Sequence, residues 1–241
     1  MNHKVSSLLA GIFISVVSVV TTLEAQTMKN EGLNAKQQTI VTIAAFTASG
    51  DLQKLKTALN EGLDAGLTVN EIKEILVQMY AYAGFPRSLN GIDTFMGVLK
   101  ERDAKGIKDK LGKEPSPLPD NKSSIELGTE IQTRLAGRPV TGAIYAFTPA
   151  IDQFLKGHLF GDIFGRDNLD FQSREIATIS ALASMAGLNP QLQAHFSIGF
   201  NVGLTEAQMR SLVSVLEAKV GKKEADNAKE ILSKVLSSRA G

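Results

Sequence analysis

Residues 166–203 read RDNLDFQSREIATISALASMAGLNPQLQAHFSIGFNVG, and this stretch decides the fold. Ile179, Leu182 and Ala186 recur at helical spacing, which predicts a helix with one apolar face. A break follows at residues 187–190, where glycine and an Asn-Pro pair interrupt the pattern, and a second helical run begins. The stretch therefore predicts two consecutive helices joined by a short turn.

The two helices carry an acid and a histidine on or beside their apolar faces. Glu175 lies about one helical turn before Ile179, on the apolar stripe where a solvated acid is not expected. His195 lies at the edge of the apolar stripe that Leu192 and Phe196 define on the second helix. If both side chains point inward, they can share one pocket as a general acid–base pair.

A purely structural interpretation of the same residues stays open. Glu175 can be a core acid that is ion-paired with Arg174 or Arg166, and His195 can be a hydrogen-bonded packing residue.

Composition excludes several classes of protein. The chain has 241 residues, 43% of them hydrophobic and 21% charged, as in an ordinary globular protein. A net charge of +1 and the absence of Trp argue against nucleic-acid binding. The chain has no cysteine, so disulfides, zinc–thiolate sites and thiol redox chemistry are excluded.

The N-terminus has the layout of a secretory signal peptide. Lys4 precedes an uncharged, largely apolar run over residues 5–20, and a cleavage site is expected after Ala25. The apolar run is shorter than the roughly 20 residues that span a bilayer, which favours cleavage over a retained membrane anchor. We therefore expect a periplasmic or secreted protein with no stable membrane anchor. His158 and His195 are then the histidines of the mature chain.

The mature chain is expected to be all-α, because no segment sustains the alternation typical of strands. Thr68 and Glu71 have the spacing of an N-terminal capping box, and Asp170 has the position of an N-cap. Pro86 should restart the chain as a further helix. Helices are predicted over residues 34–46, 52–63, 69–82, 86–99, 125–135, 151–164, 171–186 and 191–200.

The sequence also predicts two tandem copies of one helical unit. Ile40 and Thr42 match Ile176 and Thr178 at a constant shift, and the Gly-Leu-Thr run at 66–68 matches the one at 203–205. The predicted organisation is a signal peptide (1–25), a first copy (26–102), a charged, proline-containing linker (103–124) and a second copy (125–241).

The copies differ where chemistry is expected. The second copy has Arg174, Glu175 and His195, whereas the first has Tyr80 and Tyr82. A pocket composed from both copies would take its acid, base and arginine from one and its aromatic walls from the other. The alternative explanation of these differences is sequence divergence between two repeats that have only a structural role.

These motifs resemble the carboxymuconolactone decarboxylase family. The second copy shows R-D-x-L-x-x-x-x-R-E, then the inward histidine and the G-L-T turn, and the first shows G-L-T-x-x-E-I-x-E-I-L-x-Q-x-x-x-Y-A-G-F-P. The resemblance implies an alkylhydroperoxidase-D-like all-α fold and a ring-like homo-oligomer. It also implies one of two chemistries, a thiol peroxidase or a decarboxylase without cofactor or metal. The peroxidase cysteines would fall at Leu188 and Gln191, so a thiol mechanism is blocked here.

The resemblance to the decarboxylase branch implies a small substrate, a carboxylated lactone or an aromatic-derived acid. Glu175 and His195 would be catalytic, and the expected substrate-binding residues are Arg174, Arg166, Tyr80 and Tyr82. No cofactor and no metal site is expected. The contrasting hypotheses are a peroxiredoxin-type family activity, or a non-enzymatic oligomer that binds a ligand or partner.

Overall fold

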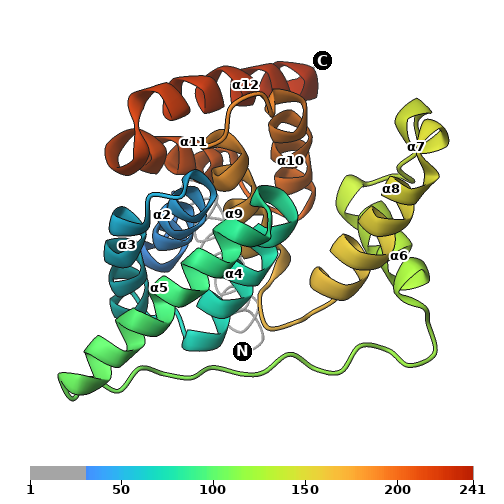
Figure 1. Cartoon of the computed structure of the whole chain (residues 1–241). Helices are drawn as coiled ribbons and strands as arrows, with labels where there is room; N and C mark the ends of the chain where they lie inside the picture. The colour runs from blue at the N-terminus through green and yellow to red at the C-terminus, as the bar shows by residue number, and fades with distance from the viewer. Residues whose placement is uncertain (1–30, 241) are drawn as a thin grey trace, which may run out of the picture.

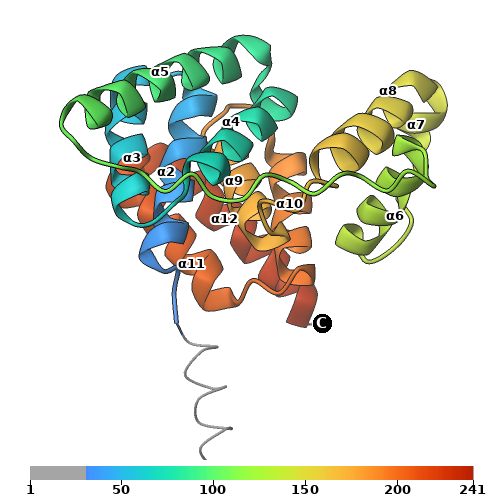
Figure 2. The same ribbon diagram turned by 90° about the horizontal axis from the view of Figure 1, so that it is seen from below.

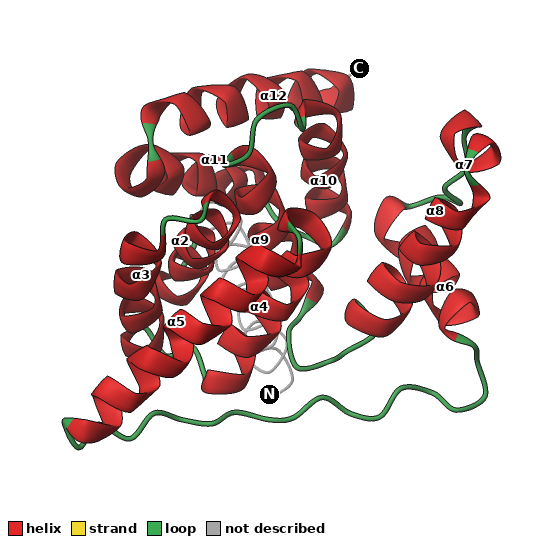
Figure 3. Ribbon diagram, in the orientation of Figure 1, coloured by secondary structure: helices red, strands yellow, loops and turns green. Residues whose placement is uncertain are grey.

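The structure, a computed structural model, describes residues 31–240, and this part of the chain folds into helices without a strand (Figure 3). The predicted all-α fold class is therefore confirmed. The helices are α2 (Ala35–Ser49), α3 (Leu52–Asp64), α4 (Val69–Ala83), α5 (Phe85–Ala104), α6 (Ser124–Ala136), α7 (Ala143–Phe147), α8 (Pro149–Gln153), the π-helix η1 (Phe154–Ile163), α9 (Phe171–Ala183), α10 (Asn189–Asn201), α11 (Glu206–Val215), the π-helix η2 (Leu216–Val220) and α12 (Lys222–Ala240).

Helices α2 and α9 form the centre of the main body and pack against each other (Figure 1). Residues 39–48 of α2 and 173–183 of α9 are buried without interruption. A helix buried around its whole circumference must be covered on every side, which the surrounding helices do. Glu175 lies within the buried run of α9, as its place on the apolar stripe predicts.

Side-chain caps fix where the main helices begin. The Thr68 hydroxyl accepts a hydrogen bond from the Glu71 N–H, and the Thr68 N–H donates to the Glu71 carboxylate, so the predicted capping box is present. Asp170 caps α9 as predicted, by accepting from the Ser173 N–H. Gly66, directly after the last turn of α3, has a φ of +94°, a left-handed conformation that glycine adopts without strain.

The same order of elements occurs twice. Helices α9, α10, α11 and α12 begin 136 or 137 residues after α2, α3, α4 and α5 respectively. This arrangement agrees with the predicted duplication, which nevertheless stays a prediction because element order alone does not prove common descent.

Helices α6, α7 and α8 and the π-helix η1 form an arm beside the main body (Figures 1 and 2). Gly128 of α6 and Gly161 of η1 lie at the crossing, where a side chain at either position would collide with the backbone of the other element. The arm contacts the main body through Leu135, Leu159, Phe160, Ile163 and Phe164. Helix α7 was not predicted from the sequence, and none of its residues is buried.

An extended segment over residues 105–123 connects α5 to the arm and runs along the main body (Figure 2). Its backbone accepts hydrogen bonds from Val69 and Asn70, and Ser116 donates to Asp167. It is therefore attached to the surface at several points. The predicted signal peptide lies outside the described residues. Within residues 31–240, no helix is both long and apolar enough to cross a membrane.

Candidate active site: an acid–histidine pair between α9 and α10

The structure brings Glu175 and His195 together. Glu175 Oε2 and His195 Nδ1 are 2.8 Å apart. The Glu175 side chain is fully buried, whereas the His195 side chain keeps 11% of its surface exposed. The hydrogen bond orients the imidazole and leaves its Nε2 free to exchange a proton with a bound molecule.

Two polar atoms beside this pair are buried and lack a hydrogen-bond partner among the described residues. They are Oε1 of Glu175 and the hydroxyl of Tyr82. The Tyr82 ring meets the His195 ring edge-on, with 5.6 Å between centroids. Thr178 is a potential hydrogen-bond partner of the Tyr82 hydroxyl. A buried polar group without a partner costs about 1–3 kcal/mol, so Glu175 Oε1 in particular needs a partner that the described residues do not supply. A bound substrate or water would supply it.

The environment keeps Tyr82 protonated. Burial raises the pKa of the Tyr82 hydroxyl far above its ordinary value, and the charge of Glu175 raises it further. The hydroxyl is therefore a hydrogen-bond donor throughout the physiological range. Because Tyr82 lies on α4 and Glu175 on α9, the two predicted copies both contribute to this site.

Arg174 and Arg166 both pair with Glu74 of α4. Arg174 Nη2 lies 2.8 Å from Glu74 Oε1, and both side chains are almost completely buried. Arg166 Nε donates to both oxygens of Glu74, at 3.0 and 2.9 Å. Gln78 accepts from Arg174 Nη1 and donates to the Arg174 carbonyl, so the network joins α4 to α9.

This network alters the predicted roles of the arginines. The Arg174 guanidinium has no exposed surface and its charge is already matched by Glu74, so it faces no substrate carboxylate in this structure. Burial lowers the pKa of Arg174, an effect that Glu74 opposes. Arg166 keeps 36% of its side chain exposed. The ion-paired interpretation proposed for Glu175 therefore describes Glu74.

Sequence reasoning did not identify Glu74 and Gln78 as members of this network. The available signal was the one used for Glu175, because Glu74 lies among the apolar residues Ile72, Ile75 and Leu76 of α4. A buried acid on an apolar helix face requires a cation, and here two arginines provide it.

Tyr80 belongs to a different cluster. Its ring stacks on Phe85 at 4.2 Å and lies 5.5 Å from His158. His158 Nδ1 is 2.8 Å from Asp162 Oδ2, and Ser124 donates to the other oxygen of Asp162. Tyr80 contacts the arm in this way, whereas Tyr82 contacts His195.

The site can perform proton transfer. It combines a buried carboxylate, an oriented imidazole and a neutral phenol, which are the groups of general acid–base catalysis. Among the described residues no group of three or more His, Asp or Glu side chains is arranged to hold a metal ion.

The comparisons with known proteins give one family match and two uncharacterized relatives. Residues 16–93 match the carboxymuconolactone decarboxylase family. The chain is 34% identical over 80 residues to an uncharacterized 15.0 kDa protein in the nqo9-nqo10 intergenic region of Paracoccus denitrificans, a match covering 32% of this chain and 60% of the relative. It is also 25% identical over 79 residues to an uncharacterized protein of Methanocaldococcus jannaschii, covering 33% of this chain and 74% of that relative.

The family match begins inside the predicted signal peptide and ends before the arm. It includes Tyr82 and Glu74 but neither Glu175 nor His195. The resemblance drawn from the motifs is therefore confirmed for residues 16–93, which match the carboxymuconolactone decarboxylase family.

Proposed function

We propose that the protein is a cofactor-independent decarboxylase that acts on a small carboxylated lactone, with Glu175, His195 and Tyr82 as its reactive site. The observation that carries this proposal is the hydrogen-bonded Glu175–His195 pair, against whose imidazole the Tyr82 ring packs edge-on. The buried Oε1 of Glu175 lacks a hydrogen-bond partner beside this oriented imidazole, and a bound molecule would supply one.

The chemistry follows from the three groups that the site brings together. The carbon–carbon bond to the substrate carboxylate breaks, carbon dioxide leaves, and the bonding electrons pass into the conjugated lactone as a dienolate. Tyr82 donates a hydrogen bond to the lactone oxygen, where negative charge develops. His195 then gives a proton to carbon and is reprotonated from solvent, and Glu175 holds the imidazole in position.

Arg166 is the better of the two predicted arginines for binding the substrate carboxylate. Arg166 and Arg174 share the single carboxylate of Glu74, so this cluster has an excess positive charge. Arg166 is the partly exposed member. We propose that Arg174 positions α9 against α4 and that Arg166 attracts the anionic substrate.

The test is an assay of the purified protein with a set of carboxylated lactones in D2O. The expected result is release of carbon dioxide and one deuterium on the product carbon. His195→Gln should reduce turnover at least 100-fold, in line with the usual contribution of a general acid. His158→Gln is the matched control, because His158 is hydrogen-bonded to its own acid on the arm and should leave turnover unchanged.

If the wild type and His195→Gln release carbon dioxide at equal rates, His195 is not the acid. If neither releases it from any lactone in the set, the decarboxylase proposal fails and a ligand-binding role remains. A thiol peroxidase is not a competing outcome, because the chain has no cysteine.

We further propose that the protein is exported and self-associates. Export rests on the signal-like residues 1–25. Self-association is supported by the arm, where Ile144, Phe147, Ile151 and Phe154 are exposed, Phe147 by 90%. Ile144 and Phe147 lie on α7, Ile151 on α8 and Phe154 at the start of η1, so the exposed apolar side chains extend along the arm. N-terminal sequencing of the exported protein tests cleavage after Ala25, and light scattering of Phe147→Ser tests the assembly.

A further inference from the structure

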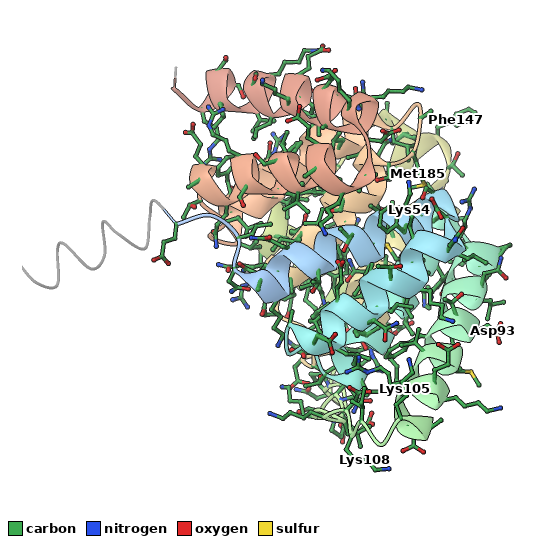
Figure 4. All side chains as sticks on the ribbon, turned by 90° about the vertical axis from the view of Figure 1, so that its left-hand side faces the viewer. Lys54, Asp93, Lys105, Lys108, Phe147 and Met185 are labelled. Carbon is green, nitrogen blue, oxygen red and sulfur yellow. The ribbon has the colours of Figure 1, made fainter. Side chains whose placement is uncertain are left out.

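A cleft of about 410 Å³ opens on the opposite side of the central α2–α9 pair, between α2, the end of α3 and α11 with η2. Figure 4 looks onto this face, where the ribbons of α2 and α3 lie beside that of α11. The volume is within the range of small-molecule sites. Its polar lining includes Gln38, Thr39, Glu61, Ser211, Ser214 and Lys219.

This cleft is the counterpart of the acid–histidine site in the other half of the chain. At the shifts that relate the helix starts, Thr39 takes the place of Glu175, and Lys219 takes the place of Tyr82. The place of His195 is taken by Ala58, which is buried. The cleft therefore has neither the acid nor the imidazole, and proton-transfer chemistry of the first kind is not available there.

The cleft also differs from its counterpart in what covers it. In the other half, Tyr82, Ile198 and Phe171 pack under the apolar cluster of the arm. Their counterparts are Lys219, Glu61 and Ala35, all of which line the cleft. Large apolar contacts have thus been replaced by two charges and a methyl group. Such a surface is suited to a polar molecule and unsuited to an apolar element of the protein.

The charges in the cleft define what it can bind. Lys219 Nζ and Glu61 Oε1 are 3.6 Å apart, and their side chains are 55% and 43% exposed. A pair this long and this exposed contributes little to stability, so a ligand can separate it at little cost. A molecule with one carboxylate and one ammonium group would satisfy both partners with closer, charge-assisted hydrogen bonds.

We infer that this cleft is a binding site for a small zwitterion of the α-amino acid class. The ligand carboxylate lies on Lys219 and its ammonium group on Glu61. Thr39, Ser211 and Ser214 line the rest of the cleft. The hydroxyls of Thr39 and Ser214 donate to the carbonyls of Lys36 and Arg210, so their oxygens remain as acceptors for a short polar side chain. The site is independent of the proposed decarboxylase activity, since it shares no residue with it.

The experiment is a titration of the full chain by calorimetry, with NMR shifts of the backbone amides as the second readout. L-Serine is the probe, and lactate and ethanolamine each carry one of its two charges. Serine should bind saturably and at least tenfold more tightly than either. Lys219→Ala and Glu61→Ala should each weaken serine binding at least tenfold, whereas Lys229→Ala, an exposed lysine outside the cleft, should not.

Three outcomes overturn the inference. The first is the absence of saturable serine binding. The second is lactate binding as tight as that of serine, together with unchanged serine affinity in Glu61→Ala, which would indicate a simple anion site. The third is serine binding that survives Lys219→Ala. His195→Gln should bind serine as the wild type does, so failure of the decarboxylase proposal leaves this test unaffected.

Discussion

At the residue scale, two buried acids explain most of the site. Glu175 was identified from its position on an apolar stripe, with His195 as its predicted partner and an ion pair with Arg174 or Arg166 as the structural alternative. In the structure both arginines are ion-paired with Glu74, and Glu175 is hydrogen-bonded to His195. Neighbours in a helix point about 100° apart, so Arg174 and Glu175 face different helices. The sequence shows which acids are buried, whereas packing decides their partners.

Arg174→Met should destabilise the protein by about 3–5 kcal/mol, because it leaves the buried Glu74 carboxylate with only the half-exposed Arg166. The double variant Arg174→Met/Glu74→Leu should recover much of the loss by removing the uncompensated charge. Urea denaturation measures both free energies of unfolding. A single variant as stable as the wild type would show that the ion pair does not hold α4 to α9.

Tyr82→Phe should separate stability from activity. It removes a buried hydroxyl that lacks a partner, so the free energy of unfolding should stay the same or rise by up to about 1–3 kcal/mol. If the hydroxyl contacts the substrate, turnover should fall in the same variant. Urea denaturation and the deuterium assay measure the two effects on one preparation. Loss of stability would mean that the hydroxyl has a partner in solution.

The same variant should also change how the free energy of unfolding depends on pH. The pKa of Tyr82 is raised in the folded protein, so above about pH 10 the unfolded chain loses this proton while the folded chain keeps it. The unfolded state then binds fewer protons, and stability falls as pH rises. Between pH 9 and pH 11 the wild type should lose more stability than Tyr82→Phe. Equal losses in urea denaturation would show that Tyr82 ionises freely.

At the element scale, the arm depends on how closely α6 and η1 approach. Gly128→Ala should disrupt it, because the added methyl group would collide with the carbonyl of Lys156. Gly97→Ala, on α5, is the matched control, since its added methyl group meets only open space. Hydrogen exchange over residues 124–163 should accelerate in the first variant. The control should be neutral or gain up to about 1 kcal/mol.

Equal exchange in the two glycine variants would mean that the arm adapts to the added methyl group. The sequence predicted α6 and the second helix of the arm from their apolar spacing, but not α7. Helix α7 has no buried residue, so no apolar stripe distinguishes it from a loop. The π-helical turns of η1 were not predicted either, because they depend on close contact with α6.

At the scale of the whole molecule, the two halves are built around one shared core. Helices α2 and α9 come from different halves, pack against each other and are buried over most of their length. The sequence predicted a site with residues from both halves, and in the structure the Tyr82 ring lies beside the Glu175–His195 pair. It did not indicate the opposite cleft, because that cleft lacks the acid, the histidine and the tyrosine of its counterpart and has no motif of its own.

This shared core predicts how the protein responds to a cut. A protease site inserted between Asp120 and Asn121, in the exposed connecting segment, should allow cleavage without separating the halves. Each half alone exposes the apolar surface of α2 or α9, so halves expressed separately should aggregate, whereas co-expressed halves should copurify. Gel filtration and thermal unfolding of the cut protein measure this, with one transition expected. Two well-folded, independent halves would contradict a shared core and place the acid–histidine site within one half alone.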